Sequence, residues 1–573
     1  MVTAKINGKE IQVPKGTTIL EAAELAGFKI PRLCYLKEIN EIGACRVCMV
    51  EIEGKKNLVA SCNNKIEEGM SILTNSPKVQ AARKMNVELI LSEHDYRCAT
   101  CVRNGNCNLQ DVAKDYNIID IPFQTVIERQ PWDPELPLIR DAGKCIKCMR
   151  CVQVCEKIQT MDIWDIVGTG KRTGVGTAGM KPLSETDCAF CGQCITHCPT
   201  GALRERNDTD VVMDAIKDPE KVVIVQIAPA VRAAWGESLG MTREQASVGR
   251  MVAAARQIGF DYIFDTDFSA DLTIMEEGNE LLERVSKGET KDMPMFTSCC
   301  PGWVRFMKTQ YPQYVDCLST AKSPQQMFGA IAKSYYAKLL EVEPDQIFCV
   351  SIMPCTAKKY ECSVPQVNDT GAEADVDVAL TTREFVRMLR TAQVNVATLE
   401  EDTFDEPLGL GTGAGVIFGA TGGVMEAALR SAVYFATGKN PRADEFTVVR
   451  GLEGIREASV EINGTTVRAA IASGLGNARK LMERLDKGEV HYDFVEIMAC
   501  PGGCAGGGGQ PIHDGQELAG VRGKKLYALD QECELRFSHE NPAIIQVYDK
   551  FLEKPLSHKS HTLLHTRQAD WDL

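Results

Sequence analysis

Apolar and polar residues alternate over the first residues of the chain, a spacing that predicts β-structure. The alternation stops at an Asn-Gly pair and then resumes, which is typical of a two-residue hairpin turn. The apolar positions of the predicted hairpin are Val2, Ala4, Ile6, Ile11 and Val13, with Asn7-Gly8 between the two strands. Thr18 and Glu21 then stand at capping-box spacing, so a helix is expected to begin there, and Gly27 is expected to end it.

The pattern from about residue 221 onward is different, because short continuous apolar runs alternate with helical segments. The runs predict buried strands at 221–227, 347–353 and 494–498, with a shorter strand at 294–298. Thr381 and Glu384 open one of the intervening helices at capping-box spacing. Each run passes into a loop that carries proline or cysteine. Since ligands of open α/β sheets gather beyond the carboxyl ends of the strands, these loops are expected to form one site.

Composition narrows the class of protein. A chain of 573 residues is expected to form about three to five domains, and 44% hydrophobic with 25% charged residues is ordinary for a globular protein. No apolar run reaches the roughly 20 residues of a membrane span, and the N-terminus lacks the features of a signal peptide. We therefore expect no membrane partner and a cytoplasmic location. The net charge of −14 argues against nucleic acid as a partner.

Cysteine is the residue type that changes this picture. Of the 24 cysteines, 15 lie in the first 200 residues and stand in short groups, whereas cysteines used only as small buried hydrophobes would be scattered. In a reducing compartment such groups indicate metal ligation rather than disulfides. The first group predicts a 2Fe–2S cluster, with a zinc site as the alternative. It consists of Cys34, Cys45, Cys48 and Cys62.

A second group has one cysteine too few for a 4Fe–4S cluster. Cys98, Cys101 and Cys107 are preceded by His94, four residues before the first of them. A lone histidine is usually a solvated or core residue. Because this one stands beside an incomplete thiolate set, we interpret its imidazole as the fourth ligand.

The spacing C-x₂-C-x₂-C-x₃-C then occurs twice, which is typical of bacterial two-cluster ferredoxins. In such proteins the fourth cysteine of each run ligates the cluster of the other run. One 4Fe–4S cluster is therefore assigned to Cys145, Cys148, Cys151 and Cys198. The other is assigned to Cys188, Cys191, Cys194 and Cys155. Up to about residue 210 the sequence predicts electron transfer alone.

Three motifs in the C-terminal half resemble the signatures of the FeFe-hydrogenases and occur in the same order. They are TSCCPGW at 297–303, MPCTAKK at 353–359 and EIMACPGGC at 496–504, and GATGGVMEAALR at 419–430 is similar to a further block of that family. The resemblance covers nearly the whole chain and is to the large clostridial type with four accessory clusters.

The fold implied by this resemblance is a multidomain α+β and α/β protein. The expected domains are a β-grasp 2Fe–2S ferredoxin-like domain at 1–80, a His-ligated 4Fe–4S domain at 81–126, a two-cluster ferredoxin domain at 127–209 and an α/β catalytic domain at 210–573. The last part of the catalytic domain, from about residue 540, resembles a fused small subunit and is expected to wrap the domain rather than contribute chemistry. His561 and His565 are expected to be packing or surface residues there.

The resemblance also implies a catalytic H-cluster, in which a cysteine bridges a 4Fe–4S cube to a diiron unit carrying CO, cyanide and an azadithiolate. By position the cube ligands are Cys300, Cys355, Cys500 and Cys504, with Cys504 as the bridge. Lys358 resembles the lysine that donates to a cyanide. The rest of the pocket is expected from Pro229, Ala230, Gln325, Met353, Phe418 and Met498.

A proton path is implied in the same way, with a thiol that binds no metal as its last member. Its expected residues are Cys299, Glu277, Ser319, Glu280 and Arg284. The spacing of the two glutamates places both carboxylates on one helix face, which is consistent with such a path.

The implied reaction is 2H⁺ + 2e⁻ ⇌ H₂, and the implied enzyme is a bidirectional ferredoxin hydrogenase that needs maturation enzymes to insert the diiron unit. At ~59 mV per pH unit the reduction potential of the H⁺/H₂ couple is roughly −410 mV at pH 7, close to the ~−400 mV of plant-type ferredoxins. Basic residues near the first ligands either steer an acidic carrier or form a solvated charged face. They are Lys29, Arg32, Lys37, Lys144, Lys147 and Arg150.

Three other functions compete with this one. A non-catalytic iron–sulfur assembly or carrier protein of the same fold would lack Cys299 or Lys358, and both are present. A sensory hydrogenase would add a signalling domain and alter the proton path. An NADH-dehydrogenase-type subunit would share only the first third of the chain, and no dinucleotide fingerprint precedes a helix.

Some positions depart from the family pattern. Cys362, Ala230 and Pro501 stand where some relatives carry another residue, and our hypothesis is that they alter redox potential or oxygen sensitivity. The other unassigned thiols are expected to be buried and structural. They are Cys317, Cys349 and Cys533.

Overall fold

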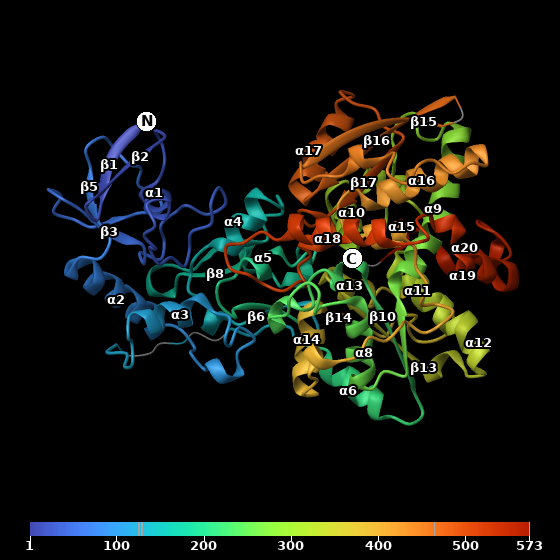
Figure 1. Ribbon diagram of the computed structural model, residues 1–573, viewed down its shortest axis with the longest axis horizontal. Coiled ribbons are helices and arrows are strands. Elements are labelled where there is room, and N and C mark those ends of the chain that lie inside the picture. The colour runs from blue at the N-terminus through green and yellow to red at the C-terminus, as the bar shows by residue number, and fades with distance from the viewer. Residues whose placement is uncertain (124–126, 128–129, 463, 572–573) are drawn as a thin grey trace. The chain divides into compact units, whose positions relative to one another are not determined.

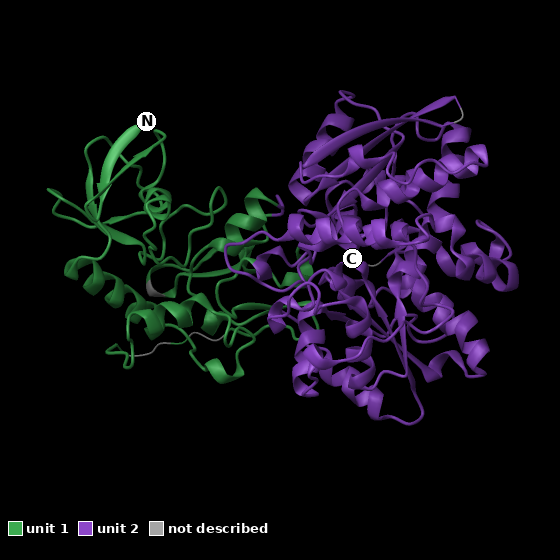
Figure 2. Ribbon diagram, viewed as in Figure 1, with its two compact units in different colours: residues 1–158, 162–186, 197–204 green, residues 159–161, 187–196, 205–573 purple. Residues whose placement is uncertain are grey.

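The computed structural model describes residues 1–123, 127, 130–462 and 464–571 (Figure 1). The boundary predicted after residue 126 therefore falls outside the described residues. The chain forms two compact units, which Figure 2 colours separately. Unit 1 comprises Met1–Ile158, Asp162–Thr186 and His197–Arg204, and unit 2 comprises Gln159–Met161, Asp187–Thr196 and Glu205–Leu573.

Unit 1 begins with the predicted hairpin, because β1 (Val2–Ile6) pairs antiparallel with β2 (Lys9–Val13). Both turn residues have positive φ, 49° at Asn7 and 82° at Gly8, as a two-residue hairpin turn requires. The strand order of the sheet is β2-β1-β5-β3-β4. Its other strands are β3 (Met49–Ile52), β4 (Val59–Ala60) and β5 (Ser71–Leu73).

The first helix, α1 (Ile19–Leu25), has the predicted capping box. The Thr18 hydroxyl accepts from the Glu21 amide at 3.2 Å, and the Glu21 carboxylate accepts from the Thr18 amide at 3.1 Å. Gly27 follows the helix with a φ of 87°, as expected of the residue that ends it. The buried face of α1 shares one apolar core with the sheet, so strands and helix together form the predicted β-grasp domain.

The rest of unit 1 consists of short elements. Its helices are α2 (Pro77–Ser92), α3 (Asn108–Asp115) and α4 (Arg150–Lys157). Its strands form two pairs, β6 (Leu138–Arg140) with β9 (Leu203–Glu205) and β7 (Trp164–Val167) with β8 (Gly174–Thr177). Most cysteines of this unit lie between these elements, so local turns decide where their thiols lie.

Unit 2 contains two separate four-stranded sheets. One has four parallel strands in the order β11-β10-β13-β14, and the other has the order β12-β17-β16-β15 with only β15 antiparallel. The four predicted strands are confirmed as β10 (Val222–Ile227), β12 (Met295–Phe296), β13 (Ile347–Met353) and β17 (Phe494–Met498). The remaining strands are β11 (Tyr262–Asp265), β14 (Val378–Thr381), β15 (Ile455–Ile462) and β16 (Thr465–Ser473).

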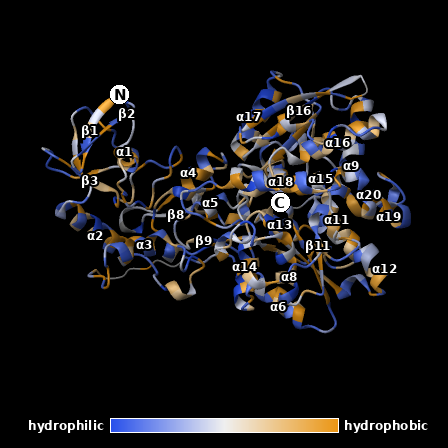
Figure 3. Ribbon diagram, in the orientation of Figure 1, coloured by the Kyte–Doolittle hydropathy of each residue, from blue (hydrophilic) through white to orange (hydrophobic). Residues whose placement is uncertain are grey.

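The strands of the first sheet are continuous apolar runs in the sequence because buried side chains pack against both faces of the sheet. Ile224 belongs to one buried cluster, whereas Val223 and Val225 belong to another on the opposite face. The same strands are mostly hydrophobic in Figure 3, and the helices around them carry both hydrophobic and hydrophilic residues. None of the described helices combines the length and apolar character that a membrane crossing requires.

Helices of unit 2 cover these sheets, and α9 (Thr266–Lys287) is 22 residues long. The helix predicted from Thr381 and Glu384 is α14 (Thr382–Thr391), and both hydrogen bonds of its capping box are present. The others are α5 (Gln193–Thr196), α6 (Thr209–Lys217), α7 (Pro229–Arg232), α8 (Val248–Ile258), α10 (Pro301–Gln310), α11 (Pro324–Ile331), α12 (Ala337–Leu340), α13 (Ala357–Glu361), α15 (Gly413–Ile417), α16 (Gly423–Thr437), α17 (Leu475–Asp486) and α18 (Ala519–Glu532).

The C-terminal segment adds α19 (Pro542–Val547), the π-helical turn η15 (Tyr548–Leu552) and α20 (His558–Leu564). Its apolar residues enter the buried cluster that also contains α11, and Ile544, Leu552 and Leu564 are fully buried there. The segment is therefore part of the core of unit 2.

Candidate active site

The loops that follow four predicted strands meet at one cavity of unit 2. Ala228 follows β10, Cys299 lies beyond β12, Met353 ends β13 and Met498 ends β17. The two sheets thus contribute two strand ends each, an arrangement that the strand pattern in the sequence did not indicate. Thr266 and Ala270, from α9, also line the cavity, and no sequence motif marks them.

Every residue predicted for the pocket lines this cavity. These residues are Pro229, Ala230, Gln325, Met353, Phe418 and Met498. Cys299, Lys358 and three of the predicted cube thiols, Cys300, Cys355 and Cys504, line it as well. Most of the lining is apolar, so a few polar groups stand in surroundings that exclude water.

The four predicted cube cysteines lie close to one another, Cys500 buried and the other three half-buried. Burial raises the pKa of all four, to about 12 for Cys355, and neighbouring thiols add to the rise at Cys355, Cys500 and Cys504. Thiolates in such surroundings need a nearby positive charge, which iron supplies. The donor set therefore fits a cube, although Cys500 does not itself line the cavity.

Lys358 lies on α13, and its ammonium group is held by a carboxylate that the sequence analysis did not single out. Lys358 Nζ donates to Glu361 Oε2 at 2.7 Å and to the carbonyl of Cys299 at 3.2 Å. The same carboxylate oxygen accepts from Ser323 Oγ at 2.9 Å and from Gln325 Nε2 at 3.1 Å. Glu361 is fully buried and thus fixes two pocket side chains at once. Its helical spacing from Lys358 was the one signal available in the sequence.

Glu277 and Cys299 both hold a proton near neutral pH. Glu277 is 1% exposed, and neither of its carboxylate oxygens has a hydrogen-bond partner among the described residues. Burial, with a further contribution from Glu280, raises the pKa of Glu277 to about 8. Burial and the nearby Glu277 also raise the pKa of the Cys299 thiol well above its ordinary value.

Glu280 lies one turn further along α9 and is bound by three groups. Its carboxylate accepts from Ser319 Oγ at 2.8 Å, from the Thr320 amide at 3.1 Å and from Arg284 at 2.6 Å. Glu277, Glu280 and Arg284 follow one another at helical spacing, as predicted. The structure therefore brings the predicted proton-path residues into one region beside the cavity.

The third signature and the glycines that follow it depend on close backbone packing. A Cβ on Gly507 would lie 2.0 Å from the carbonyl oxygen of Pro354, the residue before Cys355, so only glycine fits there. Glu496, a charged residue inside the apolar β17, accepts from the amides of Gly422 and Met425 at 2.7 Å each and so caps α16.

The first cysteine group of unit 1 is buried together in the loops of the β-grasp domain. Contacts with Cys45 and Cys62 lower the pKa of the Cys34 thiol, and Cys62 also contacts Cys48. The four sulfur atoms therefore lie close enough to share one metal centre.

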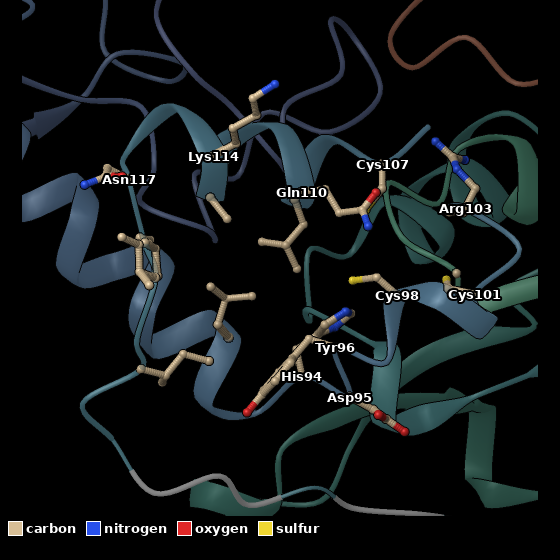
Figure 4. A pocket seen from close by; sticks show the side chains of 17 residues that line it. His94, Asp95, Tyr96, Cys98, Cys101, Arg103, Cys107, Gln110, Lys114 and Asn117 are labelled. Atoms are coloured by element: carbon tan, nitrogen blue, oxygen red, sulfur yellow. The ribbon is translucent and has the colours of Figure 1, made fainter. Parts of the chain in front are cut away.

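His94, Cys98, Cys101 and Cys107 line one cavity of unit 1, and Figure 4 shows their side chains around it. The imidazole is buried, and its Nδ1 has no hydrogen-bond partner among the described residues. Burial lowers the pKa of His94, which keeps the ring neutral near pH 7. A buried neutral imidazole with a free nitrogen beside three thiols fits the fourth ligand of a cluster.

The crossed assignment of the first ferredoxin run agrees with the geometry, since Cys145, Cys148, Cys151 and Cys198 line a single cavity of unit 1. The amide of Asn40 donates to the carbonyls of Cys34 and Cys148 at 2.8 Å each. This cavity therefore adjoins the loop of the 2Fe–2S ligands, which suits electron transfer between the two sites.

The second ferredoxin run divides between the units, because Cys188, Cys191 and Cys194 lie in unit 2 and Cys155 lies in unit 1. This ligand set stays a prediction from spacing. Within unit 2, Cys500 Sγ is 3.7 Å from the carbonyl oxygen of Cys191, and Gln159 donates to both Cys191 Sγ and the Ala499 carbonyl. One predicted ligand of the cube and one predicted ligand of the relay are thus neighbours within unit 2. Among the described residues no group of three or more His, Cys, Asp or Glu is arranged to hold a single metal ion.

Comparison with known proteins decides the family. The model for the iron-only hydrogenase large subunit, C-terminal domain, matches residues 221–508. The chain belongs to the iron-only (FeFe) hydrogenase family. Further matches to this hydrogenase are a 2Fe-2S iron-sulfur cluster binding domain at 1–77, an NADH-ubiquinone oxidoreductase-G iron-sulfur binding region at 83–122, a 4Fe-4S dicluster domain at 144–202 and an iron hydrogenase small subunit at 516–569.

Individual relatives of the hydrogenase extend over its whole length. It is 48% identical to the NADP-reducing hydrogenase subunit HndD of Solidesulfovibrio fructosivorans, with 99% of this chain and 98% of that protein covered. It is 41% identical to iron hydrogenase 1 of Clostridium pasteurianum, with 99% of each covered. The apo FeFe-hydrogenase HydA1 from Chlamydomonas reinhardtii matches at a TM-score of 0.57 and 40% identity, over 63% of this chain and 98% of that chain. The protein is thus a hydrogenase that acts on H₂ at an H-cluster and carries accessory iron–sulfur clusters.

Proposed function

We propose that this hydrogenase interconverts 2H⁺ + 2e⁻ and H₂ in both directions and exchanges electrons with ferredoxin. The observation that supports this most directly is one apolar cavity that contains Cys299, a thiol not needed for metal binding, beside Lys358 and three cube thiols. When bound, the H-cluster supplies the electrons and an open iron site for H₂. The chain supplies the ligands, the dry cavity and the proton donors.

The proposed cube ligands are Cys300, Cys355, Cys500 and Cys504, with Cys504 as the bridge to the diiron unit. Lys358 is proposed to donate to a cyanide, and Glu361 holds its ammonium group in place at 2.7 Å. The proposed accessory set is one 2Fe–2S and three 4Fe–4S clusters, held by the four ligand groups of the N-terminal third.

Protons are proposed to pass between the surface and the cavity along Arg284, Glu280, Ser319, Glu277 and Cys299. Glu280 already binds both Arg284 and Ser319, which supports the outer part of this path. Because the pKa of Glu277 is about 8, this carboxyl can take up and release a proton near neutral pH. The Cys299 thiol is then the last donor to the cavity.

Ferredoxin is proposed as the electron partner because its potential matches that of the H₂ couple. The basic residues considered for steering it are largely paired, since Lys37 contacts Glu21 at 3.0 Å and Lys147 contacts Glu93 at 2.9 Å. Local steering by these lysines is therefore weaker than their positions in the sequence suggest.

A second candidate function is that of a subunit in a larger enzyme that reduces NADP. The 48% identity to a subunit of a hydrogenase with that name favours it. We further propose a cytoplasmic location, since so many grouped cysteines without disulfides suit a reducing compartment, and a dependence on dedicated maturation enzymes.

The testing experiment measures H₂ evolution by the matured protein with reduced ferredoxin, reduced methyl viologen or NADPH as separate donors. We expect activity with ferredoxin and viologen and none with NADPH. Cys299→Ala is expected to lower each rate by about 10²–10⁴-fold, whereas Cys317→Ala, which changes a thiol outside the cavity, leaves it unchanged.

Two outcomes would count against the proposal. A protein with full iron content and the infrared bands of CO and cyanide that makes no H₂ from any donor would contradict the reaction. Activity with viologen but not with ferredoxin would favour the second candidate.

A further inference from the structure

One histidine of the C-terminal segment contacts the proton path. His565 follows α20 and is 7% exposed, so it is buried, the first of the two alternatives (packing or surface) expected for it. Its Nδ1 is 2.8 Å from Thr320 Oγ1, and its Nε2 is 3.0 Å from Glu276 Oε2. The Thr320 amide in turn donates to both carboxylate oxygens of Glu280 at 3.1 Å. Packing alone does not account for an imidazole with polar partners on both nitrogens.

The loop that carries Thr320 is held from two sides. Two backbone hydrogen bonds of 2.8 Å join residues 320–322 to residues 564–566 of the C-terminal segment. On the other side, Ser298 Oγ donates to the carbonyl of Ala321 at 2.6 Å, and Ser298 directly precedes Cys299. The loop therefore lies between the C-terminal segment and the thiol of the active site.

Glu276 holds the imidazole of His565 on the side opposite Thr320. Glu276 is fully buried and accepts from the Tyr548 hydroxyl at 2.5 Å, from the Leu556 amide at 2.9 Å and from His565 Nε2. Because this carboxylate is itself fixed by two other donors, it fixes the orientation of the ring. The other ring nitrogen, Nδ1, then faces the Thr320 hydroxyl, and either of these two groups can be the donor.

We propose that His565 is a positioning residue of the proton path. Together with Glu276 it orients Thr320, and the Thr320 amide, which donates to both oxygens of Glu280, fixes the orientation of that carboxylate in the path. The inference rests on the proposed function, because it takes Glu280 to belong to the proton path. It gives the C-terminal segment a part in proton transfer in addition to its packing.

Titratable and charged groups from several elements surround the imidazole. His561, from α20, has its ring centroid 4.5 Å from that of His565, and it is exposed. Glu276, Glu280 and Glu283 from α9 act on the charge of His561, while Arg284 binds Glu280 and Tyr548 from η15 binds Glu276. Changes in the pH profile of a His565 variant are therefore compared with those of a His561 variant.

The experiment uses matured holoenzyme and viologen-driven H₂ evolution between pH 6 and 9, in H₂O and in D₂O. His565→Ala is expected to slow the reaction by about 10-fold, to move the pH optimum and to raise the solvent isotope effect. His565→Gln keeps hydrogen-bonding groups toward Thr320 and Glu276, so it is expected to restore much of the rate and of the pH profile. His558→Ala changes an exposed histidine of the same helix and is the matched control; His561→Ala separates the effect of the neighbouring ring.

A second measurement does not depend on activity. Amide hydrogen exchange of the peptide that contains Thr320 is expected to be faster in His565→Ala and in Thr320→Val than in the wild type. If His565→Ala fails to assemble its clusters, His565→Gln and Thr320→Val provide the same comparison.

The outcomes separate this inference from the proposed function. An active wild type, with variants that change neither pH optimum nor isotope effect, overturns the role of His565 and leaves the function intact. A uniform loss of rate with an unchanged pH profile also overturns it, because that is the result of a purely structural role. A wild type with complete clusters and no H₂ evolution overturns both.

Discussion

The two kinds of predicted metal site in this hydrogenase are assembled from the chain in different ways. In unit 1, His94 and the three cysteines of its cavity lie within 14 residues, from 94 to 107. In unit 2, Cys300 and Cys504 are 204 residues apart, and they follow strands of the same sheet, whereas Cys355 follows a strand of the other. A relay site therefore depends on a few local turns, while the active site depends on the relative position of two sheets.

The two regions also differ in how they use charge. Exposure of the thiols does not separate them, since both regions contain buried and partly exposed cysteines, with Cys98 and Cys300 among the latter. The active site differs because it buries an ion pair of Lys358 with Glu361 and a carboxyl whose pKa is about 8, that of Glu277. Electron transfer needs only that clusters lie close together, whereas H₂ chemistry also needs protons at defined atoms. Changes in the relay should limit electron supply, and changes at the cavity should limit the reaction itself.

The largest effect is expected for Cys504→Ala, which removes the proposed bridge. H₂ evolution with every donor and the exchange of D₂ with water should both disappear, because the exchange occurs at the active site and needs no relay. Infrared bands of CO and cyanide report whether the diiron unit is held. Cys533→Ala is the control, since it removes a thiol outside the cavity; retention of bands and exchange in Cys504→Ala would contradict the ligand assignment.

Glu277→Gln should lower H₂ evolution and D₂ exchange together, by about 10²–10⁴-fold, because a carboxamide cannot pass on a proton. In the wild type we expect H₂ evolution to fall as the pH rises through about 8, where Glu277 loses its proton. Equal rates in the variant and the wild type would exclude Glu277 from the path.

The raised pKa of Glu277 also predicts a pH-dependent change in stability. The folded chain holds this proton between the ordinary carboxyl pKa of 4.5 and about 8, while the unfolded chain has lost it. Folding must therefore take up a proton at Glu277, and the free energy of unfolding falls as the pH rises across this window. Melting temperatures should show Glu277→Gln gaining stability over the wild type at pH 8 but not at pH 4.5; an equal difference at both values would contradict the burial argument.

A relay ligand should give the opposite pattern from that of the active site. In His94→Ala, electron-driven H₂ evolution should fall while D₂ exchange keeps its wild-type rate, because the cavity in unit 2 is unchanged. His558→Ala serves as an exposed control. A parallel fall in D₂ exchange would show that the two regions are not independent.

The smallest effects are expected from the positions that depart from the family pattern. Ala230 lines the cavity, and Cys362 Sγ accepts from Gln325 Nε2 at 3.4 Å, so both can adjust the surroundings of the diiron unit. Ala230→Ser, Cys362→Ala and Pro501→His are expected to shift the rate of oxygen inactivation or the ratio of evolution to uptake with little change in maximal rate. The hypothesis would be dropped if all three left both quantities unchanged.

Local patterns in the sequence were reliable guides to local structure. The first hairpin, the helix caps at Thr18 and Thr381, and the four apolar strands all appear as predicted, because each depends on residues that are neighbours along the chain. The spacing of the relay cysteines was informative for the same reason. Likeness to a family, rather than any local pattern, supplied the six further pocket residues.

By itself, then, the sequence determined the strands and indicated the family of this hydrogenase, and it predicted the relay ligand groups. Only the tertiary structure decided that the strands divide between two sheets. An apolar sequence shows that a strand is buried, but it does not show which other strands pair with it. It also decided which buried carboxylates hold the functional groups. Glu361 binds Ser323 and Gln325, and Glu276 binds His565, across separations of 36 to 289 residues. Contacts of this kind depend on the packing of whole helices and leave no spacing in the sequence from which they could be recognised.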